Sequence, residues 1–464
     1  RLLLDDPSSG EVVFPHELSR EYVATATPAA VRRATHRRVA VAMESSPEFA
    51  TSPRQIAAHW AASDEGWRGV PHFVAATTEA LAVGAYAEAL SAADDGLIWC
   101  AVEQAAFAYE LHHAATAALI GLGRLSAADD RANTALAWAR LTGDEAAVTH
   151  AVARTGGAYL PITYDSAPSE VVAQVLRDVH EPLHRSLLLS QLVLLERSAD
   201  PRCTEWADEA LQLAEACDDV PAQLSAAHAR LTLRYGTPVA DERLTVALRY
   251  ADLAAAHERP SERLTLALDA IGAATELGDF EQARGLVAAS ATNHVPRPLD
   301  RWWLLSHEST LAAAGGDLDE AERLAREGRT LGDELGVADA AAWYFAQLWS
   351  LNRRRGRAGE LVKVFTRQSV GVHASWRAMA AAELIATGDA VRATQILDGL
   401  NDELLALPPN YLYLGTLAVA LIAADTAGHP LAATCRDRLT PFQRMHAVYG
   451  AGCAYVAPVD ELLR

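Results

Sequence analysis

The chain has almost no lysine. Of its 40 basic residues only Lys363 is a lysine. A phosphate-binding P-loop needs the pattern Gly-x4-Gly-Lys-Ser/Thr, in which the lysine amine reaches the phosphates. Lys363 lies between Leu361 and Phe365, and no glycine precedes it at the required place. The sequence therefore excludes a P-loop ATPase module from this chain.

Paired cysteines and long apolar runs are also lacking. No two cysteines form a Cys-x-x-Cys pair, which argues against a zinc ribbon and a disulfide framework. No run of about 18 apolar residues occurs, and the first residues have no signal-peptide pattern. We therefore expect reduced thiols, no membrane insertion and a cytoplasmic location. Because the chain starts without a methionine, we also expect it to be a segment of something larger.

Positive charge is in the minority. The formal net charge is −20, with 60 acidic residues against 40 basic ones. Affinity for nucleic acids comes from clustered lysine and arginine, which is the opposite balance. We therefore expect no direct nucleic acid binding by this segment, and we interpret the acidity as a means of keeping an exposed surface soluble.

Aromatic residues and strand-like alternation are scarce. Aromatics make up 6% of the chain, while half of it is hydrophobic and largely alanine. Alanine has the highest helix propensity. Short apolar pieces such as 11–14 are the exceptions. The composition predicts an all-α protein.

A recurrent pattern of turn residues is present. Glycine reaches positive φ without strain and suits the tight turn between two helices, and a small residue early in the second helix allows close packing. From Gly278 onward the turn glycines are spaced by 38, 40, 32 and 40 residues. Alanine follows five positions later in every case but one, where Gly356 is followed by Leu361. The pairs are Gly84 and Ala89, Gly123 and Ala128, Gly278 and Ala283, Gly316 and Ala321, Gly388 and Ala393, and Gly428 and Ala433.

The clearest copies, 278–283 and 316–321, have the pattern Gly-Asp-Phe/Leu-acid-polar-Ala. This pattern resembles the turn within tetratricopeptide repeats, over roughly residues 70–440, although that repeat has 34 residues and most spacings here are longer. The prediction is an all-α fold, an α-solenoid of tetratricopeptide-like helical hairpins over residues 61–464. Glycines and prolines predict an irregular stretch around 156–240.

Residues 1–60 have a different pattern. A short strand is expected at 12–14, a helix at 17–24 and a second helix from Pro28 to Met43. The string from Phe14 to Glu21, with 33–40 and 56–60 after it, resembles the end of the winged-helix region in bacterial STAND-type regulators, including LuxR-type ones. The resemblance implies a small N-terminal winged-helix remnant, in which these residues are core residues without chemistry.

That resemblance also implies a function. In the family, a helical repeat region follows an ATPase module and senses an effector, which is a small molecule or a protein. The implied partners are therefore such an effector and the missing ATPase and output domains of the same polypeptide. The alternative is a stand-alone helical-repeat scaffold. Neither implies an enzyme, and no cofactor is expected.

One motif suggests metal chemistry. His180-Glu181-Pro182-Leu183-His184 matches His-Glu-x-x-His, in which two histidines one helical turn apart bind zinc. Pro182 disfavours helical backbone at Glu181, so we expect His180 and His184 to lie on different elements, with Pro182 in the first turn of a helix to Glu196. The helical zinc enzyme is the weakest alternative, and no metal site is predicted.

A candidate binding face is predicted from tryptophan positions. Trp303 and Trp343 each lie thirteen residues before a turn glycine, so they should be neighbours on consecutive helices. Aromatic surfaces with a few polar groups bind peptides and small molecules, and the concave side of a solenoid is its usual binding surface. The alternative is that the tryptophans fill the core. The full predicted set is Trp303, Ser306, His307, Thr310, Trp343, Tyr344, Gln347, Ser350, Arg353 and Trp376.

Overall fold

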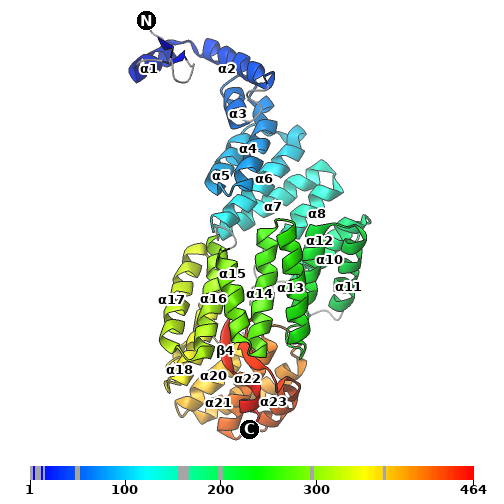
Figure 1. The fold of residues 1–464 in the computed structure, drawn as a ribbon, viewed down its shortest axis with the longest axis vertical. Helices are drawn as coiled ribbons and strands as arrows, with labels where there is room; N and C mark the ends of the chain where they lie inside the picture. The colour runs from blue at the N-terminus through cyan, green and yellow to red at the C-terminus, as the bar shows by residue number, and fades with distance from the viewer. Residues whose placement is uncertain are drawn as a thin grey trace. The chain divides into compact units, whose positions relative to one another are not determined.

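The computed structural model describes residues 4–5, 12–13, 16–46, 53–154, 167–196, 202–292, 297–368 and 373–464. In these residues it has 24 α-helices and two small antiparallel strand pairs, so the predicted all-α class is confirmed (Figure 1). Within the same residues, none of the helices combines the length and the apolar character that crossing a bilayer would require.

The chain divides into two compact units. The first consists of residues 1–122 and 127–147, and the second of 123–126 and 148–464, whereas the sequence suggested a boundary after residue 60. Residues of both units occur in α7 (Leu125–Thr142) and α8 (Glu145–Arg154). The other elements of the first unit are β1 (Leu4–Asp5), β2 (Val12–Val13), α1 (Glu17–Ala26), α2 (Ala29–Glu44), α3 (Pro53–Ala61), η2 (Gly66–Gly69), α4 (Val70–Ala82), α5 (Tyr86–Leu97), η3 (Val102–Gln104) and α6 (Ala105–Gly121).

The N-terminal elements follow the predicted pattern. Val12 and Val13 form β2, which pairs with β1, and Pro28 caps α2 in an extended conformation. Phe14 lies outside the described residues. Ala40 of α2 is buried against α3, together with Met43 of the same helix. His16 and Leu18, by contrast, are exposed, Leu18 by 78%, so the expectation that they are core residues is wrong for these two: α1 leaves that side uncovered among the described residues.

The second unit is built from long antiparallel helices. Successive helices pack in pairs, such as α13 with α14, α16 with α17 and α20 with α21. Its elements are α9 (Ala167–Leu176), α10 (Pro182–Glu196), α11 (Cys203–Ala216), α12 (Val220–Thr232), α13 (Ala240–Ala256), α14 (Pro260–Leu277), α15 (Phe280–Thr292), α16 (Pro298–Gly315), α17 (Leu318–Leu335), α18 (Ala340–Arg354), α19 (Val362–Gln368), α20 (Ala374–Ala386), α21 (Ala390–Ala406), α22 (Tyr413–Ala427), α23 (Leu431–Leu439), η4 (Thr440–Phe442), β3 (His446–Tyr449), β4 (Ala454–Pro458) and α24 (Val459–Leu462).

The predicted turn glycines are confirmed. All seven, including Gly356, have positive φ, and Gly278, Gly316 and Gly428 are left-handed C-caps at the ends of α14, α16 and α22. An aspartate often follows as the next N-cap, because its carboxylate accepts a hydrogen bond from the backbone of the next helix. Asp317 and Asp389 do so at the starts of α17 and α21.

The alanine that follows each turn is buried in all but one case. Ala283, Ala321 and Ala393 are 0% exposed, so each allows the second helix to cross the first closely. Ala433 is exposed, and the preceding Ala432 is buried instead. The physical reason is local: α23 begins only at Leu431, so the helix starts later relative to its glycine than in the other copies.

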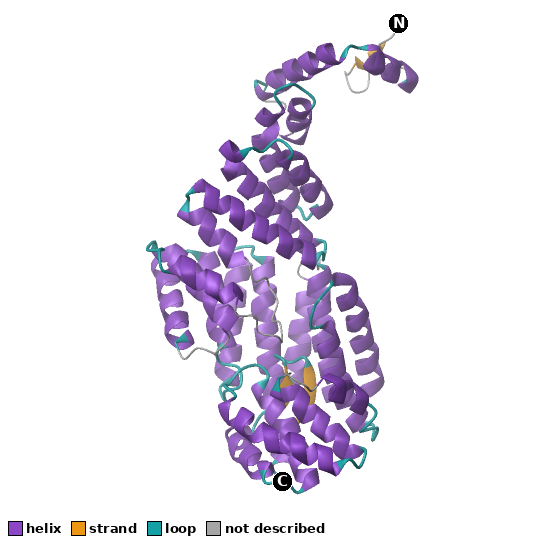
Figure 2. Cartoon of the chain, turned by 180° about the vertical axis from the view of Figure 1, so that it is seen from behind, coloured by secondary structure: helices purple, strands orange, loops and turns teal. Residues whose placement is uncertain are grey.

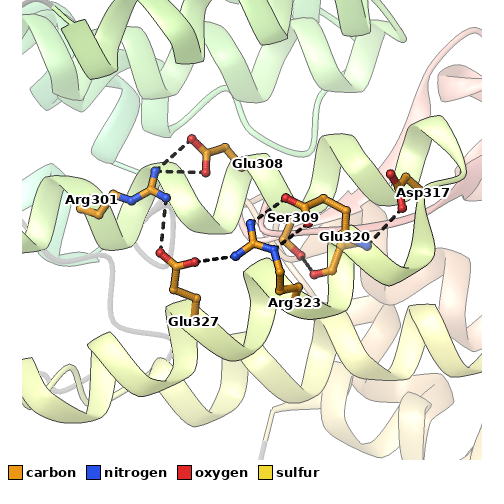
Figure 3. Close-up of polar contacts among 8 residues, drawn as sticks. Arg301, Glu308, Ser309, Asp317, Glu320, Arg323 and Glu327 are labelled. Atoms are coloured by element: carbon orange, nitrogen blue, oxygen red, sulfur yellow. Dashed lines mark hydrogen bonds and ion pairs between the residues drawn. The ribbon is translucent and has the colours of Figure 1, made fainter.

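A chain of ion pairs on the surface includes one pair that joins α16 to α17 (Figure 3). Arg301 of α16 lies 3.0 Å from Glu308 of its own helix and 3.4 Å from Glu327 of α17. Glu327 also lies 2.9 Å from Arg323, which lies 2.7 Å from Glu320. Each of these exposed pairs contributes little to stability.

The same two helices are joined beneath that surface. The buried hydroxyl of Ser309 donates a 2.8 Å hydrogen bond to the carbonyl of Ala321. Its acceptor is the alanine that follows the turn at Gly316, so the close helix crossing allows a direct side-chain to backbone contact. The pattern 316–321 therefore specifies both the turn and the packing of its hairpin.

A β-hairpin lies among the helices of the second unit (Figure 2). β3 pairs with β4, with Tyr449 opposite Ala454. β3 contacts α14 and α22, and β4 contacts α16, α18 and α22. The turn between them places Gly450, Ala451 and Gly452 at positive φ. Its apolar side chains are buried, among them Val448, Tyr449, Ala454 and Tyr455. The sequence analysis did not predict this hairpin.

Candidate partner-binding site

The predicted tryptophans do lie side by side. The ring centroids of Trp303 and Trp343 are 5.0 Å apart with a T-shaped geometry, and Trp302 packs against both. Trp303 is 8% exposed and Trp343 is 3% exposed. Trp376 is equally buried but lies elsewhere, with its ring 4.9 Å from that of Phe365. The rings are therefore part of the core cluster, as the alternative interpretation had it.

Three of the predicted polar residues hold the β-hairpin by its main chain. Thr310 of α16 and Gln347 of α18 both donate to the carbonyl of Cys453, at 2.6 and 2.8 Å. Ser350, one turn after Gln347, donates to the carbonyl of Tyr455. Consecutive helices thus present hydroxyl and amide donors to an extended segment, and the segment bound in this structure is the chain's own.

Ser306 and His307 complete this polar row on α16. The carbonyl of Ser306 accepts a 3.2 Å hydrogen bond from the Gln347 amide. His307 is 2% exposed and lies so close to Gly452 that a Cβ there would be 3.1 Å from the imidazole. Burial lowers the pKa of His307 to about 4, although Asp269 acts in the opposite direction. His307 is therefore neutral at physiological pH.

Tyr344 and Arg353 are the half-buried members of the predicted set. The Arg353 guanidinium lies 5.3 Å from the ring of Trp349, and burial lowers its pKa. The next two arginines contact the chain itself. Arg354 donates to the carbonyl of Ala313, and Arg355 pairs with acidic residues of α17.

A buried polar cluster, which the sequence analysis missed, lies in the same unit. Asp269 of α14 accepts hydrogen bonds from His228 at 2.7 Å and from the Tyr235 hydroxyl at 2.8 Å. The Arg243 guanidinium stacks 3.7 Å from the Tyr235 ring centroid and pairs at 2.6 Å with Glu276, also of α14. Arg243 is 1% exposed, so its charge is compensated inside the protein.

A sequence signal for this cluster existed. Asp269 and Glu276 are seven residues apart, which places them on one face of α14. That helix also carries the buried Ile271 and Ala274, so the two acids lie among buried apolar side chains of the same helix. A buried carboxylate needs a partner that compensates its charge, and α13, the preceding helix, offers Arg243.

The His-Glu-x-x-His motif has the predicted arrangement. α10 begins at Pro182, so His184 is helical and His180 precedes the helix. The Glu181 carboxylate accepts a 2.7 Å hydrogen bond from the backbone N–H of His184, as a helix cap does. In the described ranges, no three or more His, Cys, Asp or Glu side chains are grouped to hold a metal ion.

The described contacts account for the Cys435 thiol and for the carboxylates of Asp94 and Asp95. Cys435 is buried, and burial raises the pKa of its thiol to about 12, so it stays protonated. Asp94 and Asp95 pair with Arg131 and Arg54 on the surface.

No family model and no curated protein matches the sequence. Among the described residues, one arrangement is suited to binding an extended peptide segment. It is a row of donors on α16 and α18 that binds the main chain of an extended segment.

Proposed function

We propose that residues 61–464 form an α-solenoid of tetratricopeptide-like hairpins, and that this array is the effector-sensing and protein-interaction region of a bacterial STAND-type transcriptional regulator in the cytoplasm. The observation that carries the proposal is the recurrence of one turn. The left-handed glycines at 278, 316 and 428 each end a long helix that packs against the next one. Stacked hairpins of this kind are used as binding surfaces.

The proposed mechanism is a population shift. An effector or partner protein that binds one state of the array better changes its contacts with ATPase and output domains elsewhere in the polypeptide. Because Thr310, Gln347 and Ser350 hold the chain's own hairpin, the partner contacts the half-buried members of the predicted set, Tyr344 and Arg353.

The experiment has two steps. The first is to read the open reading frame upstream of Arg1, where a Gly-x4-Gly-Lys-Ser/Thr loop is expected in frame. The second compares ATP-dependent self-association of the complete polypeptide with that of a version lacking 61–464, by light scattering after size-exclusion chromatography. An altered nucleotide dependence is expected. An upstream frame without the loop, or assembly that is unchanged by the deletion, contradicts the proposal.

A further inference from the structure

Two histidines face each other between α2 and α3 in the first unit. The Nδ1 atoms of His36 and His59 are 3.0 Å apart, and the ring centroids are 5.1 Å apart with a tilt of 41°. Both side chains are partly buried. The contact therefore joins two helices that are separated in sequence by a segment outside the described residues.

This contact requires at least one neutral imidazole. In an N–H···N hydrogen bond one ring nitrogen donates and the other accepts, and a doubly protonated imidazole has no acceptor. If both rings are protonated, two donors and two positive charges face each other at hydrogen-bond distance. The contact thus exists in one protonation range and is repulsive in another.

The second half of α2 is attached independently. Ala40 and Met43 are buried against Ile56 and Trp60 of α3. Glu44, at the end of α2, accepts a 2.7 Å hydrogen bond from the Trp60 indole. These contacts do not involve His36, so they remain when the histidine contact is lost.

The charged groups along the seam, which is the contact of α2 with α3 and the elements after it, do not compensate a second positive charge on the His36–His59 pair. Arg37, next to His36, pairs with Glu65 at 3.1 Å and lies 4.0 Å from Asp64. Arg68 of η2 is shared between Glu65 and Glu44, so these carboxylates already have cationic partners. The other charged groups on the elements of this seam are Arg32, Arg33 and Arg38 on α2, Arg54 on α3, which pairs with Asp95, and on α4 Glu79 and His72, which lies 2.9 Å from Glu44.

We propose that His36 and His59 form a pH-sensitive latch that holds the first half of α2 against α3 near neutral pH and releases it in mildly acidic solution, while the second half of α2 stays attached. The His72–Glu44 contact gives the contrast, because the partner of His72 is a carboxylate and not a second imidazole. The latch does not depend on the proposed function.

The direction follows from proton linkage. Burial, and then the neighbouring His36, lower the pKa of His59 from its ordinary value of 6.5. The closed state therefore binds protons less readily than the open one. Its stability is fully present above pH 6.5 and is lost as the pH falls below that value.

The test is hydrogen–deuterium exchange of the full chain, one pH unit above and one below the ordinary histidine pKa of about 6.5, with rates corrected for intrinsic exchange. Peptides from residues 29–39 are expected to exchange several-fold faster at the lower pH, up to about tenfold for one pKa unit. Peptides from α4 to α6 serve as internal controls and are expected to stay unchanged. Equal corrected rates for 29–39 at both pH values overturn the proposal.

Variants separate the latch from general acid sensitivity. In His59→Gln the imidazole whose pKa is lowered is absent, so residues 29–39 are expected to exchange equally at both pH values, whatever the absolute rate. In His36→Gln the burial of His59 remains, so the response is expected to be smaller than in the unaltered chain. His72→Gln is the matched control and is expected to keep the response. A pH-dependent rise that persists in His59→Gln, or one in His36→Gln as large as in the unaltered chain, overturns the proposal.

Discussion

Single buried charges in the second unit depend on their partners. Arg243 is 1% exposed and pairs with the buried Glu276. Arg243→Leu leaves the carboxylate buried without its cation, and removal of one member of a buried pair costs about 3–5 kcal/mol. We expect a loss of that size in the free energy of unfolding, measured by urea titration followed by circular dichroism.

The double variant Arg243→Leu/Glu276→Leu is the matched control. Because it removes both charges, it should be much less destabilised than Arg243→Leu, and buried pairs replaced by apolar residues are often neutral. A double variant as unstable as the single one would mean that shape, and not charge, determines the cost.

His307 should make the protein acid-sensitive. Burial lowers its pKa from 6.5 to about 4, so the folded state holds it neutral while the unfolded chain protonates at 6.5. Stability is therefore present above pH 6.5 and falls as the pH drops towards 4, by up to about 3 kcal/mol. We expect His307→Gln to have a flatter dependence of the urea midpoint on pH in this range. Parallel profiles would contradict the assignment.

At the residue scale the sequence predicted which side chains share a helix face, but not which distant segment they contact. The spacing from the turn glycines placed Trp303 beside Trp343, because helical periodicity fixes which side chains share a face. It could not show that Thr310 and Gln347 face a hairpin more than a hundred residues later. That contact is set by tertiary packing, which periodicity does not encode.

The role of the turn glycines can be tested by comparing Gly316, which ends α16, with Gly285, which lies inside α15. Gly316 has φ +91°, and no atom lies within 4 Å of a Cβ built there, so Gly316→Ala tests backbone conformation alone. A left-handed alanine costs about 1–2 kcal/mol. Gly285 lies inside α15 with equally open space, and alanine there should stabilise by up to about 1 kcal/mol. Opposite signs in the urea midpoints are expected; equal signs would contradict the assignment of the turn.

The helices were predictable and the C-terminal strands were not. Turn glycines such as Gly278 mark helix ends because few other residues adopt positive φ, so the signal is local. The segment 446–458 has an apolar composition and three turn residues, which suit several structures. It forms a hairpin because α14, α16, α18 and α22 surround it, and only packing decides that.

The stability of the second unit depends on the hydrogen bonds that α16 and α18 donate to the β3–β4 hairpin. The Cys453 carbonyl accepts from Thr310 and Gln347. Thr310→Val and Gln347→Leu each leave one donor, whereas the double variant leaves a buried acceptor without either side chain, at about 1–3 kcal/mol. We expect the double loss in unfolding free energy to exceed the sum of the single ones.

Thr330→Val is the matched control for this series, since Thr330 is exposed on α17 and bonds only within its own helix. It should change stability by less than about 0.5 kcal/mol. Strict additivity of the Thr310 and Gln347 variants would mean that the two donors do not share the carbonyl in solution.

The hairpin also sets an order of events during synthesis. Thr310 and its acceptor Cys453 are 143 residues apart. At a translation rate of roughly 5–20 residues per second, more than about 7 s pass between the appearance of one and the other. During that interval α16 and α18 have no strand to enclose, and their donors and apolar side chains are accessible to chaperones. Helical hairpins can close as they leave the ribosome, but the interior of this unit is completed only after most of its helices have been made.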